Sequence, residues 1–313
     1  MKYYPQEINK YFKSGREEDL VHIAESRHIL QFEQLRRLIN FSCMRTINNH
    51  LTAAVLVTGP SSSGKTTFSN RLSREMEEEG YQCTVISIDD YYLSKDEIKR
   101  RQPNAEKPDY EVLEAFDVEF FQSQMRQFLK GEPIDLPRYD FHLGRRVESG
   151  RTLKPTDKDL LIIEGIHAMN PKLTEGLPFA RTIGVYICPF DSYSIPGKGD
   201  ITSKEIRLMR RALRDFVHRS SSISQTLDMW PSVRAGEEKY IKPMKQYADF
   251  FFNSSFEYEI CILKSRIEDA AEKMNEEELN RLKSFLPLEL LKEFHTCREI
   301  NIPDNSIFNE FYK

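Results

Sequence analysis

The residues with the clearest chemical potential form the stretch GPSSSGKTT, residues 59–67. Its glycines, lysine and first threonine fill every defined position of the P-loop pattern G-x4-G-K-[ST]. Glycines let the backbone wrap around phosphate oxygens, and the amides at a helix N-terminus add partial positive charge. A glycine- and serine-rich turn is the structural alternative. The phosphate cradle that we predict comprises Gly59, Ser61, Ser62, Ser63, Gly64, Lys65, Thr66 and Thr67.

Two residues of this cradle have predicted chemical roles. Lys65 is expected to bind the β- and γ-phosphates of a nucleotide, and the Thr66 hydroxyl is expected to ligate Mg²⁺. Hydrolases, nucleotide switches and kinases all need such a cradle, so the destination of the phosphate depends on the rest of the chain.

Carboxylates follow two later apolar runs. Asp89 in SIDDYY comes directly after a run expected to form a strand adjacent to the P-loop strand, where it would reach the metal or the attacking group. The neighbouring Asp90 is expected to cap the turn. Glu164 ends LLIIEG, at the sheet edge where ligands bind in open α/β sheets. It is predicted to hold Mg²⁺ directly or through water, with a plain strand-end turn at Gly165 as the alternative.

A basic run follows the glycine- and proline-containing break IPGKGD, residues 195–200. Arginines spaced three and four apart share roughly one face of a helix. After a flexible hinge, such a helix is expected to act as a lid that clamps phosphates and shuts out water. A solvated basic face or an RNA patch is the alternative. The arginines at this spacing are Arg207, Arg210, Arg211 and Arg214, and the run ends with Arg219.

The segment LPRYDFHLGRR, residues 136–146, has no strong generic meaning. Its Tyr139, Asp140 and His142 are compatible with an ordinary packed loop or with part of a site.

These motifs together resemble the uridine kinase and phosphoribulokinase family of P-loop kinases. The resemblance covers roughly residues 51–255, in the order GPSSSGKTT, SIDDYY, DYEVLEAFD, LPRYDF, IIEGIHAMN and RLMRRALRDF. The segments MWPSVRAGEEKYI, ADFFFNS and IPDNSIFNEF resemble a bacterial-type, uridine kinase-like branch. Many members of that branch carry extra N-terminal domains similar to part of threonyl-tRNA synthetase. The resemblance therefore suggests the kinase portion with a short helical leader.

The resemblance implies roles for individual positions. Asp89 matches the carboxylate that orients or deprotonates the acceptor hydroxyl, and Glu164 matches a magnesium-associated acid. The implied metal ligands are Thr66, Asp89 and Glu164, and the implied catalytic residues are Asp89, Lys65, Arg210 and Arg214. The implied acceptor-binding residues are Asp109 at the ribose hydroxyls, Tyr139 and His142 near the base, Arg207 and Gln225.

One position departs from the family pattern. Uridine–cytidine kinases place a base-reading histidine five residues after the tyrosine of YDF, where this chain has Gly144. His142 is two residues earlier, and in an extended segment that shift re-aims a side chain by several ångströms. A site that hydrogen-bonds a base discriminates by about 10⁴ or more against analogues that lack the partner group. The identity of the base therefore stays open at this point.

Alternating strands and helices are needed to position these residues. Short apolar runs predict strands at residues 53–59, 82–89, 159–165, 181–188, 249–254 and 258–265. Helices are predicted at residues 65–80, 111–131 and 203–219. This order indicates an α/β P-loop NTPase fold, with a mostly parallel sheet flanked by helices, an arginine-rich helical lid and added terminal helices.

We expect three parts along the chain. Residues 1–50 form a helical leader with apolar Ile29, Phe32, Leu35, Leu38 and Ile39 at helical spacing. Residues 51–265 form the P-loop nucleoside kinase core, and residues 266–313 form a helical extension packed on that core.

Composition limits the class of protein. With 313 residues, 39% hydrophobic and 30% charged, the chain is long enough and apolar enough to bury a large core. A net charge of −4 argues against a dedicated nucleic-acid partner. The sequence has no apolar run of membrane-spanning length, no secretory signal and no CxxC spacing. We expect a cytoplasmic protein whose cysteines are reduced, with Cys83, Cys188 and Cys261 packed within strand-like runs.

The predicted function is Mg²⁺- and ATP-dependent phosphorylation of the 5′-hydroxyl of a uridine- or cytidine-like ribonucleoside. One alternative is a kinase for another hydroxylated metabolite such as a sugar phosphate, as in phosphoribulokinases. Another is an ATP-binding regulatory module with little turnover. The sequence does not distinguish ATP from GTP as donor. Family members are often homo-oligomers, which the resemblance allows here without fixing a stoichiometry.

Overall fold

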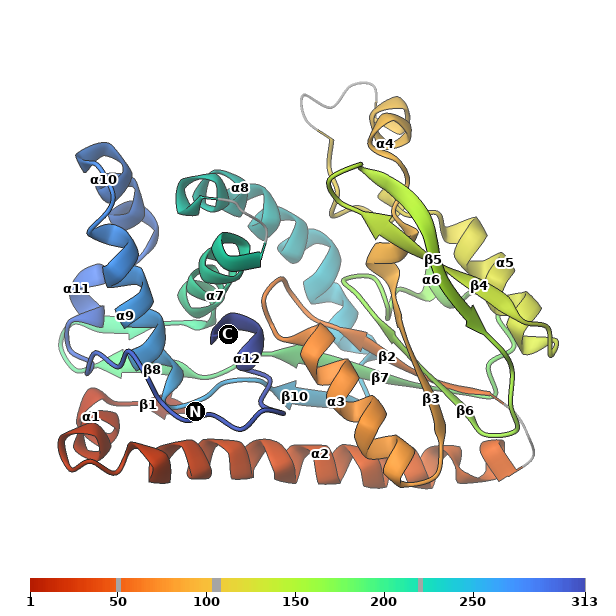
Figure 1. Cartoon of the computed structure of the whole chain (residues 1–313), viewed down its shortest axis with the longest axis horizontal. Helices are drawn as coiled ribbons and strands as arrows, with labels where there is room; N and C mark the ends of the chain where they lie inside the picture. Colours follow the sequence, from red (N-terminus) through yellow and green to blue (C-terminus); the bar gives the residue numbers. More distant parts are fainter. Residues whose placement is uncertain (49–51, 103–107, 219–221, 313) are drawn as a thin grey trace.

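The computed structural model describes residues 1–48, 52–102, 108–218 and 222–312, and its centre is a parallel sheet (Figure 1). The five strands are ordered β10-β7-β2-β6-β3, and every neighbouring pair is parallel. Their bounds are β2 Ala53–Thr58, β3 Gln82–Ser87, β6 Asp159–Glu164, β7 Arg181–Cys188 and β10 Phe250–Asn253. The P-loop strand β2 is the central strand, so its ligand-binding end has a neighbour on each side.

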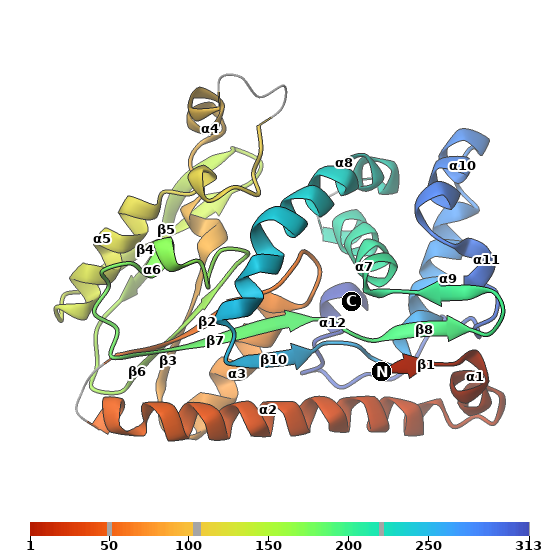
Figure 2. The same cartoon turned by 180° about the vertical axis from the view of Figure 1, so that it is seen from behind.

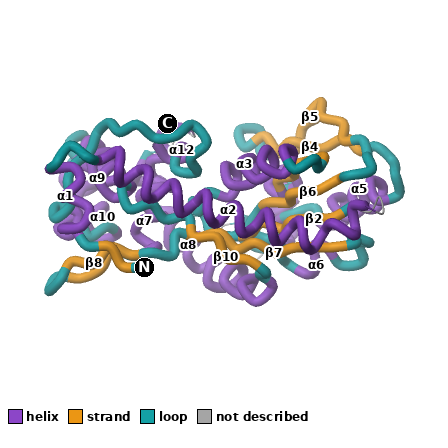
Figure 3. Tube along the Cα trace, turned by 90° about the horizontal axis from the view of Figure 1, so that it is seen from below, coloured by secondary structure: helices purple, strands orange, loops and turns teal. Residues whose placement is uncertain are grey.

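Both faces of the sheet are buried. The helices α2 (Glu17–Asn48) and α3 (Lys65–Glu78) share one apolar cluster with Val55 and Val57 of β2. On the opposite face, Ala54 and Leu56 pack in a second cluster with α5 (Val118–Leu129). Every residue of β2 and β6 is buried, which explains why these strands are continuous apolar runs without alternation. Figure 3 shows α2 crossing beneath the sheet along most of the molecule.

A two-stranded hairpin stands beside the sheet on the side of β3. It pairs β4 (Ile134–Asp140) with β5 (Arg145–Leu153) in antiparallel fashion. Close to it lie the 3-10 turns η1 (Ile88–Tyr91) and η2 (Leu113–Ala115) and the helices α4 (Lys95–Arg101) and α6 (Pro171–Thr174). Figure 1 shows this group above the carboxyl end of β3.

The other side of the molecule is mainly helical (Figure 2). A small sheet joins β1 (Lys2–Tyr3), β8 (Ser192–Ile195) and β9 (Gly199–Ile201) in the order β1-β8-β9. The helices of this side are α1 Pro5–Lys13, α7 Ser203–His218, α8 Ile223–Gly236, α9 Glu259–Ala271, α10 Glu276–Phe285, α11 Leu288–Leu291 and α12 Asn309–Tyr312. A π-helical turn, η3 (Glu237–Ile241), and a 3-10 turn, η4 (Lys242–Tyr247), connect α8 to β10.

The α/β fold class is confirmed, and five of the predicted strands are present as β2, β3, β6, β7 and β10. The prediction of a sixth strand at residues 258–265 was wrong, because these residues begin helix α9. Residues 259–265 are all buried, and a helix that is buried on every side carries the same unbroken apolar run as a buried strand.

Three further expectations need correction. The strand β3 is not adjacent to β2, because β6 lies between them. The helix expected over residues 111–131 begins only at Val118, where the Asp117 side chain caps it by accepting a hydrogen bond from the Phe120 N–H. The break at residues 195–200, expected to be irregular, is the turn of the β8–β9 hairpin, in which the Lys198 N–H donates to the Ile195 carbonyl.

Residues of the expected leader, core and extension share one apolar cluster. Phe32 of α2, Phe68 of α3 and Phe308 near the C-terminus all belong to it. Of the leader residues with helical spacing, Phe32, Leu35 and Ile39 are buried, whereas Ile29 is exposed. Residues 50 and 51, where the leader is expected to meet the core, lie outside the described ranges, and the division into three parts stays a prediction.

The five cysteines are buried free thiols, as expected for residues that fill the core. Cys83 and Cys188 lie on strands, but Cys261 lies on helix α9. Within the described ranges, no helix is both long and apolar enough to cross a membrane.

Candidate functional site

The cradle predicted from GPSSSGKTT connects the central strand β2 to helix α3. Gly59 is required at its start, because an ideal Cβ there would lie 2.1 Å from the Ile187 carbonyl oxygen of the neighbouring strand. Gly64 has a φ of 92° and Ser62 a φ of 58°, so the loop turns through the left-handed region just before the helix. The amides of the first turn of α3 therefore face the loop at the carboxyl edge of the sheet.

The side chains of the cradle have unused hydrogen-bonding capacity. The hydroxyls of Ser62 and Ser63 are buried and have no hydrogen-bond partner among the described residues. The Lys65 ammonium donates to the carbonyl oxygens of Gly59 (3.0 Å) and Pro60 (3.2 Å), so it bends back over its own loop. Buried polar groups are normally paired, so these hydroxyls and this ammonium suit an anionic ligand with several oxygens, such as a nucleotide polyphosphate.

Glu164 joins the cradle to the strand end of β3. Its Oε1 accepts hydrogen bonds from the Ser87 hydroxyl (2.8 Å) and the Thr66 hydroxyl (3.3 Å). The register explains this contact, because Glu164 pairs with Val57 on one side and Ser87 on the other. The pKa of Glu164 is raised to about 7, first by burial and then by the Asp89 charge, against the opposing effects of Lys65 and the Ser87 hydroxyl.

This raised pKa predicts a pH-dependent stability. A carboxyl group whose pKa is higher in the folded protein favours folding in its protonated form, so its contribution falls as pH rises from about 4.5 to about 7. Glu164→Gln keeps one oxygen that can accept the hydrogen bonds of Ser87 and Thr66, but its side chain cannot ionise. We expect the metal-free variant to gain stability over the native protein as pH rises through this window, by on the order of 3 kcal/mol at most. Thermal denaturation at pH 5, 6, 7 and 8 measures this difference, and parallel pH profiles would contradict it.

The two neighbouring aspartates have different surroundings. The Asp90 carboxylate accepts a hydrogen bond from the Tyr139 N–H (3.0 Å), which ties η1 to strand β4. Asp89 is half-buried and close enough to Glu164 and Glu111 to raise the pKa of both carboxyl groups. Asp90 thus makes a structural contact with the backbone of a strand and not the turn cap expected of it, and Asp89 lies among the acidic groups of the cradle.

The arginines of helix α7 face the cradle from its other side. Arg207 donates to the Ser61 carbonyl (3.3 Å), and Arg211 donates to the Ser61 hydroxyl (2.6 Å). Arg210 is fully buried, and its strongest contacts are to the Glu259 carboxylate (2.7 Å) and the Ser254 carbonyl (2.7 Å). Guanidinium charge is therefore held against the phosphate loop.

The other two arginines of the run have no described contact with the phosphate loop, and Arg207 has a second partner besides that loop. Arg214 forms an ion pair with Asp215 (2.9 Å), and Arg219 lies outside the described residues. Arg207 is also paired with both carboxylate oxygens of Glu237 (2.7 and 2.9 Å). The acceptor-binding role predicted for Arg207 and the lid role predicted for Arg210 and Arg214 stay predictions.

An aromatic cluster lies on the β4 side. Tyr139 is 7% exposed, and its ring centroid lies 5.6 Å from that of Tyr92. Tyr92 in turn stacks on Phe116 at 4.1 Å and donates its hydroxyl hydrogen to the Tyr110 carbonyl. Aromatic faces of this kind suit a planar base or another flat ring.

The DYEVLEAFD segment places two acids differently. The Asp109 carboxylate accepts a hydrogen bond from the Glu111 N–H (2.9 Å), so it shapes the turn. The Glu111 side chain interacts electrostatically with charged groups of the cradle. Its pKa is raised to about 7, chiefly by burial, with Asp89 adding to the rise and Arg211 and Lys65 opposing it. Glu111 was not among the predicted site residues, although it lies in the same motif as Asp109.

Two predicted acceptor residues lie in exposed positions. His142 is exposed in the β4–β5 turn, where its backbone N–H donates to the Asp140 carboxylate. Gln225 is exposed at the start of α8, where its side chain closes a capping box with Ser222. Gly144 has a φ of 64°, and an added Cβ would lie 2.5 Å from the Lys95 side chain. The turn therefore favours glycine where a histidine is expected from the family pattern.

The donor set of the site fits a magnesium ion that is shared with phosphate. In the described part of the chain, no group of three or more His, Cys, Asp or Glu side chains could hold a metal by itself. Mg²⁺ is usually held by one or two protein oxygens together with substrate phosphates and water. Thr66, Glu164 and the nearby Asp89 supply oxygen ligands of that kind.

Comparisons with known proteins agree with this description. A family model described as the Phosphoribulokinase / Uridine kinase family matches residues 54–187. The uridine kinase of Lactiplantibacillus plantarum is 27% identical over 219 residues, which cover 69% of this chain and 94% of that protein. The uridine kinase of Streptococcus equi subsp. zooepidemicus is 29% identical over 194 residues, covering 62% and 83%. A solved structure of a possible uridine kinase from Bacillus stearothermophilus has 23% sequence identity and a TM-score of 0.41, covering 70% of this chain and 99% of that one.

A P-loop on the central strand of a parallel sheet, with the buried Glu164 at the end of β6 and the half-buried Asp89 just after β3, defines a nucleotide-binding α/β protein. Residues 54–187 of the chain match the phosphoribulokinase/uridine kinase family. Over this part the chain is similar to P-loop phosphotransferases, and ATP is the donor that this family implies.

Proposed function

We propose that this protein transfers the γ-phosphoryl group of ATP to the 5′-hydroxyl of a ribonucleoside, with a uridine- or cytidine-like base. The observation that carries the proposal is the meeting of three acids with Lys65 and Arg211 beside an aromatic cluster. The pKa values of Glu164 and Glu111 respond to Asp89 and Lys65, so these side chains share one electrostatic environment. A hydrolase uses water as the acceptor and needs no binding surface for a second substrate, whereas a kinase needs such a surface.

The donor side of the mechanism uses positive charge. Phosphoryl transfer needs little covalent help from the protein and depends on alignment and charge stabilisation. Lys65 would leave the carbonyl oxygens that it now contacts and bind the β- and γ-phosphates. Arg211, already on the Ser61 hydroxyl, and the predicted catalytic arginines Arg210 and Arg214 would offset the charge that develops on the transferred group.

The acidic side would hold the metal and orient the acceptor. Thr66, Glu164 and Asp89 would bind Mg²⁺, which screens the phosphate charge when bound. Asp89 would also accept the hydrogen bond of the acceptor hydroxyl and so direct its oxygen toward the phosphorus. We add Glu111 to the acceptor side, where Asp109 holds its backbone and its own carboxylate would bind ribose hydroxyls.

The base would lie against the aromatic cluster of Tyr92, Phe116 and Tyr139. Arg207, His142 and Gln225 complete the predicted acceptor set, and the last two would have to approach the base from exposed positions. Because Gly144 replaces the base-reading histidine, we expect weaker discrimination between bases than in a site that hydrogen-bonds the base directly.

A coupled assay of ADP release tests this function. The purified protein with Mg²⁺–ATP is supplied with uridine, cytidine, adenosine, guanosine, a pentose phosphate or 5′-deoxyuridine. We expect uridine or cytidine to stimulate ADP release and 5′-deoxyuridine, which lacks the acceptor hydroxyl, to have no effect. Stimulation by the pentose phosphate alone would indicate the sugar-phosphate alternative. ATP binding without stimulation by any acceptor would overturn the proposal in favour of a regulatory module.

A further inference from the structure

The segment of residues 303–312 lies directly against the phosphate cradle. An ideal Cβ on Gly64 would lie 2.4 Å from the Cγ2 atom of Ile307, so this side chain touches the last glycine of the P-loop. Arg71 of helix α3 donates to the Asn305 carbonyl (3.3 Å), which holds the segment along the same helix. Figure 2 shows α12 between the P-loop region and the helices α7 and α9. The segment is therefore one wall of the donor site.

Glu310 of this wall contacts two groups that would otherwise be available to phosphate. Its Oε2 accepts a hydrogen bond from the hydroxyl of Thr67, in the first turn of α3 (3.0 Å). Its Oε1 lies 3.9 Å from an Nη1 of Arg214, the arginine expected to face the phosphates. Glu310 is also one of the groups that raise the pKa of Glu164, so its charge is felt inside the site.

We propose that the Glu310 carboxylate takes the place of a nucleotide phosphate on Thr67 and Arg214, and that donor binding requires its displacement. A hydroxyl and a guanidinium are the partners that a phosphate oxygen selects. Here the Glu310 carboxylate accepts the hydrogen bond of the hydroxyl and lies within ion-pair distance of the guanidinium. Glu310 then acts as a charge gate that lowers the affinity of the free protein for polyphosphates. This inference rests on the donor half of the proposed function.

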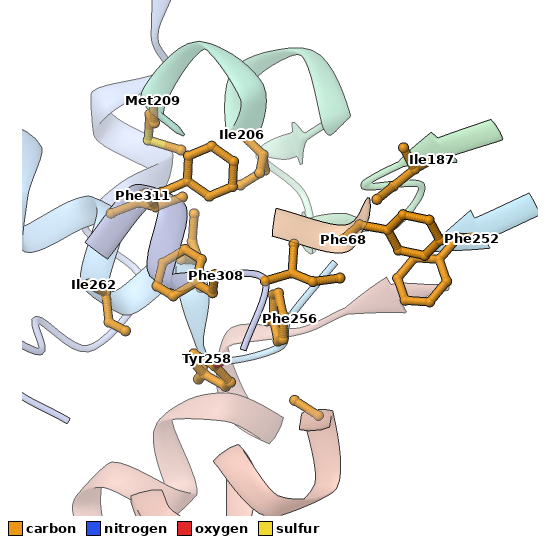
Figure 4. Close-up of a cluster of buried hydrophobic side chains, with 14 of the residues drawn as sticks. Phe68, Ile187, Ile206, Met209, Phe252, Phe256, Tyr258, Ile262, Phe308 and Phe311 are labelled. Atoms are coloured by element: carbon orange, nitrogen blue, oxygen red, sulfur yellow. The ribbon is translucent and has the colours of Figure 1, made fainter. Parts of the chain in front are cut away.

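The moving part is the side chain and not the whole segment. Ile307 and Phe308 are fully buried, and the Ser306 hydroxyl donates to Glu25 of helix α2 (2.6 Å). Figure 4 shows the ring of Phe308 surrounded by core side chains, with Phe311 beside Met209 and Ile206 of α7. Glu310 itself is only partly buried, with 17% of its side chain exposed, so it can rotate while its backbone stays fixed.

Glu310→Gln tests the gate, because the amide can still accept the Thr67 hydrogen bond but carries no charge. The dissociation constants of ADP and of inorganic tripolyphosphate are measured by displacement of a fluorescent ATP analogue. We expect both ligands to bind about three- to tenfold more tightly to the variant, because a like charge next to the phosphates is removed. Glu277→Gln, in the exposed first turn of α10, changes the net charge equally and should leave both constants unchanged.

A double-mutant cycle tests whether Glu310 affects polyphosphate binding through its contact with Thr67. In a Thr67→Val background the Glu310→Gln change should improve polyphosphate binding less, because the contact between the two residues is already lost. Weaker or unchanged binding to Glu310→Gln alone would overturn the proposal, and weaker binding would make Glu310 a ligand of the nucleotide. If none of the proteins binds ADP, the donor half of the proposed function fails as well. Loss of the nucleoside response alone bears only on the acceptor.

Discussion

Asp89→Asn is expected to lower kcat for nucleoside phosphorylation by about 10²–10⁴-fold, the range for losing a positioned acid–base group. The amide has the same shape as the carboxylate but cannot accept a proton and attracts Mg²⁺ weakly. Lys65 and the loop amides are unchanged, so ATP should still bind within a few-fold of the native affinity. Steady-state kinetics and nucleotide titration of the same preparation separate these two effects.

The neighbouring residue provides the matched control. Asp90→Asn keeps an oxygen that can accept the hydrogen bond of the Tyr139 N–H, so its loss of activity should be much smaller. If both variants lost activity equally, or if only Asp90→Asn did, the assignment of Asp89 as the acceptor-facing acid would be wrong.

Arg210→Met is expected to destabilise the protein by about 3–5 kcal/mol, because it leaves a buried carboxylate without its partner. Arg210 and Glu259 are both completely buried, and they are joined at 2.7 Å. Burial already raises the pKa of Glu259, and the arginine opposes that rise. Urea denaturation with an activity measurement on the folded fraction shows whether Arg210 acts on stability, on catalysis or on both.

Two variants sharpen this test. Adding Glu259→Gln to Arg210→Met removes the stranded charge and should restore part of the stability. Arg214→Met removes an arginine that is 14% exposed and lies near Asp215 and Glu310, and it should cost less stability. Native-like stability of Arg210→Met with lost activity would assign Arg210 to the lid alone.

Most of the sheet could be predicted from the sequence, because strands buried on both faces carry short, unbroken apolar runs bounded by glycine or acids. The same signal failed at Cys261 and its neighbours, since a fully buried helix has no polar face. The order of the strands was not predictable from their order in the chain. The interposition of β6 between β2 and β3 depends on pairing between residues 77 positions apart, such as Ser87 and Glu164.

The predicted site residues fall into two groups: those whose positions follow from a short sequence motif, and those whose positions depend on tertiary packing. Lys65, Thr66 and Glu164 belong to motifs whose geometry follows from a strand end and a helix start, and the structure places them together. Glu111 was missed because Asp109, two residues away, carries the same chemistry. The roles of Arg210 and Gln225 were implied by the family resemblance. The ion pair of Arg210 with the buried Glu259 depends on tertiary packing. The capping contact of Gln225 depends on the exact residue at which α8 begins.

The contact between Ser306 and Glu25 joins residues 281 positions apart, and it holds the wall of the donor site in place. During synthesis the P-loop and its acidic partners leave the ribosome well before residues 303–312 exist. The proposed charge gate therefore depends on a contact between this late segment and the earliest long helix, α2, and that contact forms only after residues 303–312 have been made.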